Sequence, residues 1–148
     1  MKLETDGEPI HKVSIIPMGR ALGATMYLPV RDRYHWNRRQ ILSQITSAFG
    51  GRVAEELFCE DISTGAENDL QVATDLARRM VIEWGMSDAL GPVYLRDDQA
   101  SGFLGWENPR THSFSEQTAV SVDKEVRRIL DECYTRAKAH IQAHVPEV

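Results

Sequence analysis

Apolar residues recur every three to four positions over long stretches of this 148-residue chain. That spacing places them on one face of an α-helix, the face that packs against a core. Three such stretches cover residues 37–57, 66–84 and 113–145 and predict three principal helices. The expected core positions are Ile41, Ile45, Ala48, Phe49, Val53 and Leu57 in the first helix, Leu70, Ala73, Ala77, Met80, Val81 and Trp84 in the second, and Val122, Val126, Ile129, Leu130, Cys133, Ala137 and Ile141 in the third.

Residues suited to helix ends flank these stretches. Asn37 is expected to cap the first helix, and either Ser113 or Ser115 the third, because their side chains accept hydrogen bonds from free backbone N–H groups. Gly85 is typical of the residue that follows a helix and is expected to end the second. Pro146 is expected to end the third, since proline does not continue a helix.

Two glycines, Gly50 and Gly51, fall inside the first predicted helix. Each costs a helix about 1 kcal/mol relative to alanine. We expect close contact with a neighbouring helix to offset that cost.

Two shorter apolar runs near the N-terminus, residues 13–16 and 21–28, are separated by a turn and predict a β-hairpin. Gly23 in the second run indicates a bulge or a close backbone approach. The predicted fold class is therefore mainly α with a small β-hairpin near the N-terminus, in a single domain over residues 1–148. Residues 1–9 are interpreted as a lead-in, and residues 97–111, rich in Gly, Asp, Asn and Pro, as a flexible loop.

The net charge, the lengths of the apolar stretches and the cysteine count argue against several classes of function. The net charge of −5, with no basic run, argues against a nucleic acid partner. No apolar stretch approaches the roughly 18 to 20 residues that span a bilayer, and no signal peptide is visible, so the chain itself is expected to be soluble. The two cysteines, Cys59 and Cys133, are too few for a disulfide framework, and each is interpreted as a small buried apolar residue.

Two ordered motifs carry a resemblance to a known family. GGRVAEEL at residues 50–57 is followed by STGAENDLQVATDLARRMV at residues 63–81, and HKVSIIPMGRALGATMYLP precedes them at residues 11–29. Together they resemble the C-terminal part of the peptidase domain of FtsH, the membrane-bound AAA+ zinc metalloprotease family. The resemblance is close over residues 9–95, and it implies a helical metallopeptidase-type domain. The last fifty or so residues resemble the family only in being helical.

The resemblance assigns roles to two carboxylates. Asp69, in the Thr-Gly-Ala-x-Asn-Asp context, is similar to the third zinc ligand of the family. Glu55, the first glutamate of Gly-Gly-Arg-x-Ala-Glu-Glu, is similar to a group that orients a zinc-binding histidine through its outer N–H. Spacing alone favours plainer roles, namely an acid stabilised by the helix dipole for Asp69 and a solvated helix end for Glu55.

The resemblance also implies a substrate contact at the hairpin. In metalloproteases of this general type, a substrate adds as an extra strand to an exposed sheet edge. Gly23, Ala24, Thr25 and Met26 are the residues expected near such an edge. A hairpin that only packs against the domain is the alternative.

The family's His-Glu-x-x-His helix is not found in this sequence. None of the five histidines lies in that pattern; His140 and His144 have helical spacing, but Ile141 follows the first, and the pair is interpreted as a polar helix end. No GxxxxGK[ST] phosphate-binding loop is present, so no ATP site is expected. We therefore expect this chain to hold zinc weakly or not at all and to have no peptidase activity alone.

The sequence is thus interpreted as part of the peptidase domain of an FtsH-like ATP-dependent zinc metalloendopeptidase. The resemblance implies a parent that degrades membrane and unfolded proteins in protein quality control. It also implies a homo-oligomer, a hexamer in the family, located at the cytoplasmic side of the inner membrane. The implied partners are an upstream peptidase helix, an ATPase module and protein substrates. The alternative is a non-catalytic helical interaction or oligomerisation module derived from such a domain.

Overall fold

The structure is a computed structural model of the whole chain, and it describes residues 10–14, 16, 24–27, 35–59, 62–95 and 114–145. The predicted lead-in over residues 1–9 and the predicted loop over residues 97–111 lie outside the described residues. The described elements are β1 (Ile10–Ser14), β2 (Ala24–Tyr27), α1 (Arg38–Phe58), a 3₁₀ turn η1 (Thr64–Ala66), α2 (Glu67–Ile82) and α3 (Glu116–Ala143).

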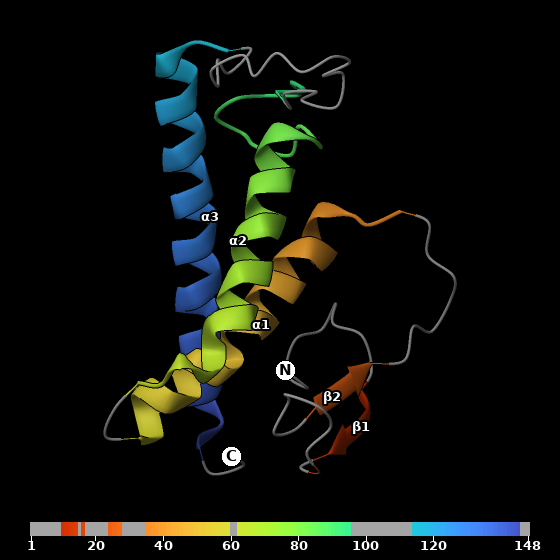
Figure 1. Cartoon of the computed structure of the whole chain (residues 1–148), viewed down its shortest axis with the longest axis vertical. Helices are drawn as coiled ribbons and strands as arrows, with labels where there is room; N and C mark the ends of the chain where they lie inside the picture. The colour runs from red at the N-terminus through yellow and green to blue at the C-terminus, as the bar shows by residue number, and fades with distance from the viewer. Residues whose placement is uncertain are drawn as a thin grey trace, which may run out of the picture.

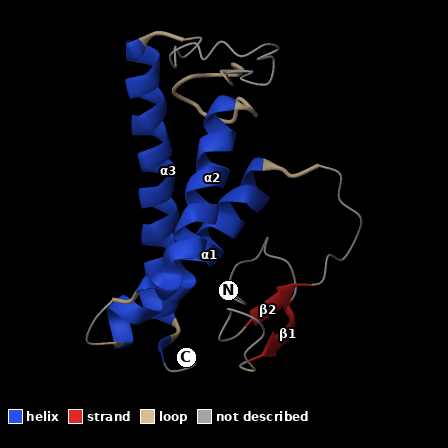
Figure 2. Ribbon diagram, in the orientation of Figure 1, coloured by secondary structure: helices blue, strands red, loops and turns tan. Residues whose placement is uncertain are grey.

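The three α-helices pack against one another, and α3 lies along both α1 and α2 (Figures 1 and 2). The two strands form an antiparallel hairpin. The predicted fold class, mainly α with a small hairpin near the N-terminus, is confirmed. None of the helices in the described part of the chain is both long and apolar enough to cross a membrane.

The helix ends follow the sequence signals closely. The Asn37 side chain accepts a hydrogen bond from the Gln40 backbone N–H at 3.0 Å, and the Gln40 side chain accepts one from the Asn37 N–H at 3.1 Å. This reciprocal pair is a capping box. Of the two candidate serines, Ser115 caps α3 by accepting from the Thr118 N–H at 3.2 Å. Gly85, just after α2, has the left-handed φ of 57° expected of a helix-ending glycine.

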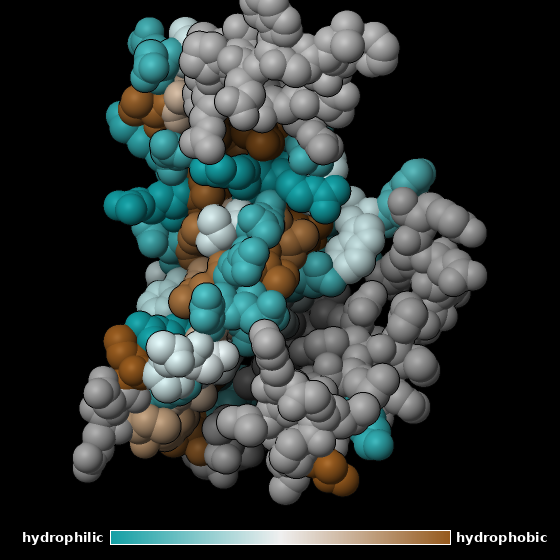
Figure 3. Space-filling model, in the orientation of Figure 1, coloured by the Kyte–Doolittle hydropathy of each residue, from teal (hydrophilic) through white to brown (hydrophobic). Residues whose placement is uncertain are grey.

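The buried core is formed by the predicted apolar faces of the three helices. It contains Ile41, Ile45, Phe49 and Val53 of α1, Ala73, Ala77, Met80 and Val81 of α2, and Val122, Val126, Ile129, Cys133 and Ala137 of α3. Leu70 was expected in the core but is 38% exposed, because the first turn of α2 lies at the edge of the bundle. Apolar residues follow the seams between the helices, and polar residues cover much of their outward faces (Figure 3).

The cysteine interpretation holds for one residue and fails for the other. Cys133 is buried in the core, and burial raises the pKa of its thiol. Cys59 is exposed, so its predicted burial is wrong. The reason is local: α1 ends at Phe58, and Cys59 leaves the helix with extended backbone angles.

The first strand of the hairpin lies slightly earlier in the sequence than predicted, whereas β2 falls within the predicted run 21–28. β1 begins at Ile10 and ends at Ser14, and its Val13 pairs with Thr25 of β2. The apolar residues that suggested the strand, Val13 and Ile16, are 63% and 69% exposed. The register irregularity falls on β1, between Ile10 and Lys12, while Gly23 lies outside the described residues.

A polar network ties the turn after α2 to the other two helices. The buried carboxylate of Glu125 in α3 accepts hydrogen bonds from the Ser87 hydroxyl at 3.0 Å and from two guanidinium nitrogens of Arg128 at 2.8 Å each. Asp88, in the same turn, accepts two bonds from Arg38 of α1 at 2.9 and 2.7 Å. A buried carboxylate is costly unless it is paired, so this network makes the burial of Glu125 tolerable.

We predict that Glu125→Gln lowers the free energy of unfolding at neutral pH by about 1–3 kcal/mol, since it removes a charged, buried hydrogen-bond acceptor. The matched control is Glu132→Gln, which removes the more exposed second partner of Arg128 and is expected to cost under about 1 kcal/mol. Urea unfolding followed by circular dichroism measures both. Equal losses in the two variants would contradict the prediction.

The pairing of Glu125 with Arg128 also makes the stability of the fold depend on pH, in a direction set by the pKa of Glu125. The Arg128 guanidinium and the Ser87 hydroxyl hold the pKa of Glu125 below its ordinary value, although burial opposes this shift. A lowered folded-state pKa contributes stability that is present above the ordinary carboxyl pKa and is lost as the pH falls through the folded value. The acid-side loss of stability should therefore be smaller in Glu125→Gln than in the unchanged chain.

We also predict that Gly85→Ala destabilises the fold more than Gly91→Ala. Both glycines have positive φ, 57° and 74°, which costs a non-glycine residue about 1–2 kcal/mol. A Cβ on Gly85 would lie 2.9 Å from the Pro92 Cα, whereas none of the described atoms lies within 4 Å of a Cβ on Gly91. Thermal unfolding of the two variants compares the steric cost directly, and equal midpoints would contradict it.

Candidate metal-binding site

The two carboxylates singled out in the sequence lie where the end of α1 meets the start of α2. Gly51 and Glu55 are four residues apart in α1, a spacing that places them on one face of the helix. Asp69 lies in the first turn of α2. Figure 1 shows that these two helix ends lie at the same end of the bundle as the C-terminus of α3.

Glu55 is held by one residue of the connection between the helices. Its Oε1 accepts a hydrogen bond from the Ser63 hydroxyl at 2.5 Å, and its Oε2 accepts one from the Ser63 backbone N–H at 3.1 Å. These bonds hold the pKa of Glu55 below its ordinary value, with the hydroxyl making the larger contribution. Glu55 is therefore a fixed carboxylate anion at neutral pH.

The turn that leads into α2 is built on the same serine. The Ser63 Oγ also accepts a hydrogen bond from the Gly65 backbone N–H at 3.0 Å, which starts η1. A Cβ on Gly65 would lie 3.1 Å from this Oγ and 3.7 Å from the Glu55 Oε1. The absence of a side chain at Gly65 thus lets the turn lie close against both groups.

Asp69 differs from Glu55 in having no polar partner in the described part of the chain. Among the described residues, no hydrogen bond or ion pair is made to its carboxylate, which is partly buried. Burial raises the pKa of Asp69 above its ordinary value. Its position near the helix N-terminus favours the negative charge, but only by about 0.3–1 kcal/mol. A partly desolvated carboxylate without a partner has the properties of a group that binds a cation.

Gly51 leaves space beside this carboxylate. A Cβ built on Gly51 would lie 3.9 Å from the Asp69 Oδ2, which is ordinary van der Waals contact. Among the described residues, the group nearest to a Cβ at Gly51 is thus the Asp69 side chain of α2, at a distance that an alanine would also allow. A larger side chain at Gly51 would compete with Asp69 for the same space.

A complete metal site would need more ligands than this region supplies. In the described parts of the chain, no three or more His, Cys, Asp or Glu residues are grouped closely enough to hold a metal ion. Asp69 fits the role of one oxygen ligand of a zinc ion, which accepts carboxylates beside imidazoles. At the end of α3, the His144 Nδ1 lies 2.8 Å from the His140 carbonyl oxygen and so faces the backbone.

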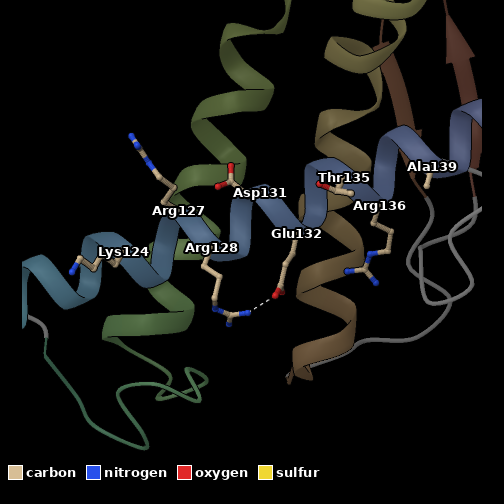
Figure 4. A pocket seen from close by; sticks show the side chains of 8 residues that line it. All are labelled: Lys124, Arg127, Arg128, Asp131, Glu132, Thr135, Arg136 and Ala139. Atoms are coloured by element: carbon tan, nitrogen blue, oxygen red, sulfur yellow. Dashed lines mark hydrogen bonds and ion pairs between the residues drawn. The ribbon is translucent and has the colours of Figure 1, made fainter.

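Two hollows elsewhere on the surface do not add to this set. One is a groove along the outer face of α3, where Arg128 pairs with Glu132 at 2.5 Å (Figure 4). The other lies between the start of α1 and the end of α2, where the Arg79 guanidinium stacks over the Trp84 ring at 4.6 Å. The first is lined by charges of both signs and the second mainly by apolar and aromatic side chains.

The structure places the sequence-predicted residues in two groups. Asp69 and Glu55 come together at the junction of α1 and α2. Ala24, Thr25 and Met26 lie in β2, while Gly23 lies outside the described residues. The bonding of Ser63 to Glu55 was not predicted from the sequence, although Ser63, Thr64 and Gly65 include residue types that favour turns.

The fold and this junction define a helical domain with a partly buried carboxylate, unpaired among the described residues, in the first turn of a helix. Residues 2–148 match the family model described as Peptidase family M41. The chain belongs to this family of peptidases.

Individual relatives agree with this assignment. The chain is 52% identical over 139 residues to the ATP-dependent zinc metalloprotease FtsH of Pelodictyon phaeoclathratiforme, covering 93% of this chain and 21% of that protein. It is 43% identical over 147 residues to FtsH 1 of a Thermoanaerobacter species, covering 99% of this chain and 24% of the relative. For FtsH of Thermotoga maritima, the values are 44% over 140 residues, 94% and 23%. The resemblance to the FtsH family is confirmed, and the chain spans between a fifth and a quarter of these relatives.

Proposed function

We propose that this chain forms part of the peptidase domain of an ATP-dependent zinc endopeptidase, in which Asp69 supplies a carboxylate ligand to the zinc ion. The observation that carries this proposal is the partly buried Asp69 carboxylate, which has no polar partner among the described residues. The names of the relatives, ATP-dependent zinc metalloprotease, support the same reaction class.

The remaining ligands are proposed to come from residues beyond this sequence. The family's His-Glu-x-x-His helix would contribute two imidazoles and a glutamate that acts as general base. Zinc, when bound, acts as a Lewis acid and lowers the pKa of a bound water. Asp69 would contribute oxygen coordination and negative charge, and Glu55 would hold the adjoining turn and orient a histidine ligand.

Other properties of the whole protease are proposed on the same basis. We infer protein substrates, including membrane and unfolded proteins, an ATPase module that delivers them, assembly into a hexameric ring, and a location at the cytoplasmic side of the inner membrane. These properties rest on the family resemblance alone. The chain itself spans less than a quarter of each of these relatives.

The hairpin is proposed to contact substrate. In the described residues β2 pairs with β1 along one edge, and no described strand pairs with its other edge. An extended peptide can add to such an edge through backbone hydrogen bonds. The residues concerned would be Gly23, Ala24, Thr25 and Met26.

For the 148-residue chain alone, we predict neither proteolysis of casein nor tight zinc binding. Asp69 contributes one ligand, and the described residues group no further set of three donors around it. Zinc content by elemental analysis, with Asp69→Ala beside it, measures this. About one zinc per chain that is lost in Asp69→Ala would contradict the prediction and would indicate ligands from a second copy.

A chimera tests the role of Asp69 in a complete protease. The matching segment of the Thermotoga maritima relative, 140 residues long, would be replaced by that of this chain. We predict that the chimera binds zinc and cleaves casein, and that Asp69→Asn weakens zinc binding at least about tenfold, because even the loss of a hydrogen-bonding partner of a ligand costs about 10- to 100-fold. The matched control is Asp75→Asn, an exposed acid on the same helix, which should leave both properties unchanged.

Two outcomes of the chimera experiment would count against the proposal. Equal zinc affinity in Asp69→Asn and in the unchanged chimera would exclude Asp69 as a ligand. A folded chimera that binds no zinc at all would favour the alternative function, a non-catalytic helical interaction module.

A further inference from the structure

We propose that Ser63 is a positioning residue that, together with Glu55, fixes the turn from which Asp69 is presented. The residues concerned are Glu55, Ser63 and Gly65, here called the Ser63 cluster. The inference rests on the proposed function for the role of Asp69. The hydrogen bonds of the cluster do not depend on that role.

The cluster joins the last turns of α1, which contain Glu55, to the start of η1, which contains Gly65 and is capped by Ser63. Ser63 makes three hydrogen bonds: its hydroxyl and its backbone N–H both donate to Glu55, at 2.5 and 3.1 Å, and its Oγ accepts from the Gly65 N–H at 3.0 Å. The hydroxyl of Ser63 thus acts as donor and acceptor at once. The Ser63 end of the turn is therefore tied directly to a side chain of α1, and Gly65 is tied to it only through the Ser63 hydroxyl.

The start of α2 depends on this arrangement because it has no cap of its own. Asn37 and Ser115 cap α1 and α3 with side-chain hydrogen bonds, but the residue at the corresponding position of α2 is Ala66, which makes none. Instead, η1 runs directly into α2, so the Ser63 cluster lies immediately before the helix. The first turn of α2, which contains Asp69, is therefore anchored through η1.

The negative charge of Glu55 also supports the positioning role proposed for the Ser63 cluster. The Ser63 bonds lower the pKa of Glu55, so Glu55 remains an acceptor for both Ser63 donors at neutral pH. Bonds to a carboxylate are stronger than bonds between neutral groups. Gly65 allows the turn to lie against this carboxylate, since its Cα approaches Ser63 and Glu55 without a side chain between them.

The role proposed for Glu55 through a histidine is different and can be separated experimentally. In that role Glu55 acts directly on a zinc ligand, and Ser63 has no necessary part. In the present proposal Glu55 acts through Ser63 on the backbone that carries Asp69. Removing the Ser63 hydroxyl while keeping Glu55 therefore distinguishes the two.

The first experiment uses the 148-residue chain without metal. Amide hydrogen exchange by NMR would be measured at Gly65 in Glu55→Ala, a variant that leaves the Ser63 Oγ in place as the acceptor of the Gly65 N–H. We expect exchange at Gly65 to become about tenfold faster, in line with the loss of a charge-assisted bond. The matched control is Glu56→Ala, which removes the contacts of Glu56 with Tyr134 and Lys138 of α3.

The control separates local order from general stability. Glu56→Ala weakens the packing of α1 against α3 but should leave the Gly65 rate unchanged after correction for the thermal midpoint of each variant. Unchanged exchange at Gly65 in Glu55→Ala, or equal acceleration in both variants, would overturn the proposal.

The second experiment uses the chimera described above. We expect Ser63→Ala to weaken zinc binding about 10- to 100-fold, as measured for groups that position metal ligands, and Ser63→Thr, which keeps the hydroxyl, to restore it. Unchanged zinc affinity in Ser63→Ala would overturn the proposal and favour the direct action of Glu55 on a histidine. If the unchanged chimera binds no zinc, the proposed function fails, while the exchange measurement still decides whether the Ser63 cluster orders the turn.

Discussion

The close packing of α2 against both α1 and α3, which also pack against each other, is the constraint on which the rest of the structure depends. Ala73 and Ala77 are fully buried in the middle of α2, and their small side chains allow the larger side chains of the neighbouring helices to fill the space between them. Once the middle of α2 is fixed, both of its ends are fixed as well. One end carries Asp69, and the other carries the turn that contains Gly85.

Near the two ends of α2, the carboxylates of Glu125 and Asp69 differ in how their negative charge is stabilised. Beyond the C-terminal end, the Glu125 carboxylate is paired with Ser87 and Arg128, and its pKa is lowered. Near the N-terminal end, the Asp69 carboxylate has no described partner, and its pKa is raised by burial alone. A structural acid is satisfied within the fold, whereas a ligand must remain available. The departure from complete polar pairing at Asp69 supports the binding role proposed for this residue.

Local signals in the sequence predicted the helices well because their causes are local. The Asn37 cap and the glycine after α2 act on the backbone within a few residues. The burial of Cys59 was predicted wrongly because it rested on the general tendency of free cysteines to be buried, whereas Cys59 lies just past the end of α1 and is exposed. The family motif identified Asp69, but the bonding of Glu55 to Ser63 depends on how the chain returns after α1, and no periodicity encodes that path.

A metal ligand must be held in place more firmly than an ordinary surface acid. Ligand geometry has to be correct to within about 0.5 Å, and neighbouring packing and hydrogen bonds provide that precision. In the role proposed for Asp69, packing would come from the buried face of α2, and polar support would come from η1, which Ser63 caps. Gly51 provides the space on the side of α1. Of the motif glycines, Gly65 has the closest contact, because a Cβ there would lie 3.1 Å from the Ser63 Oγ and would require this hydroxyl to shift.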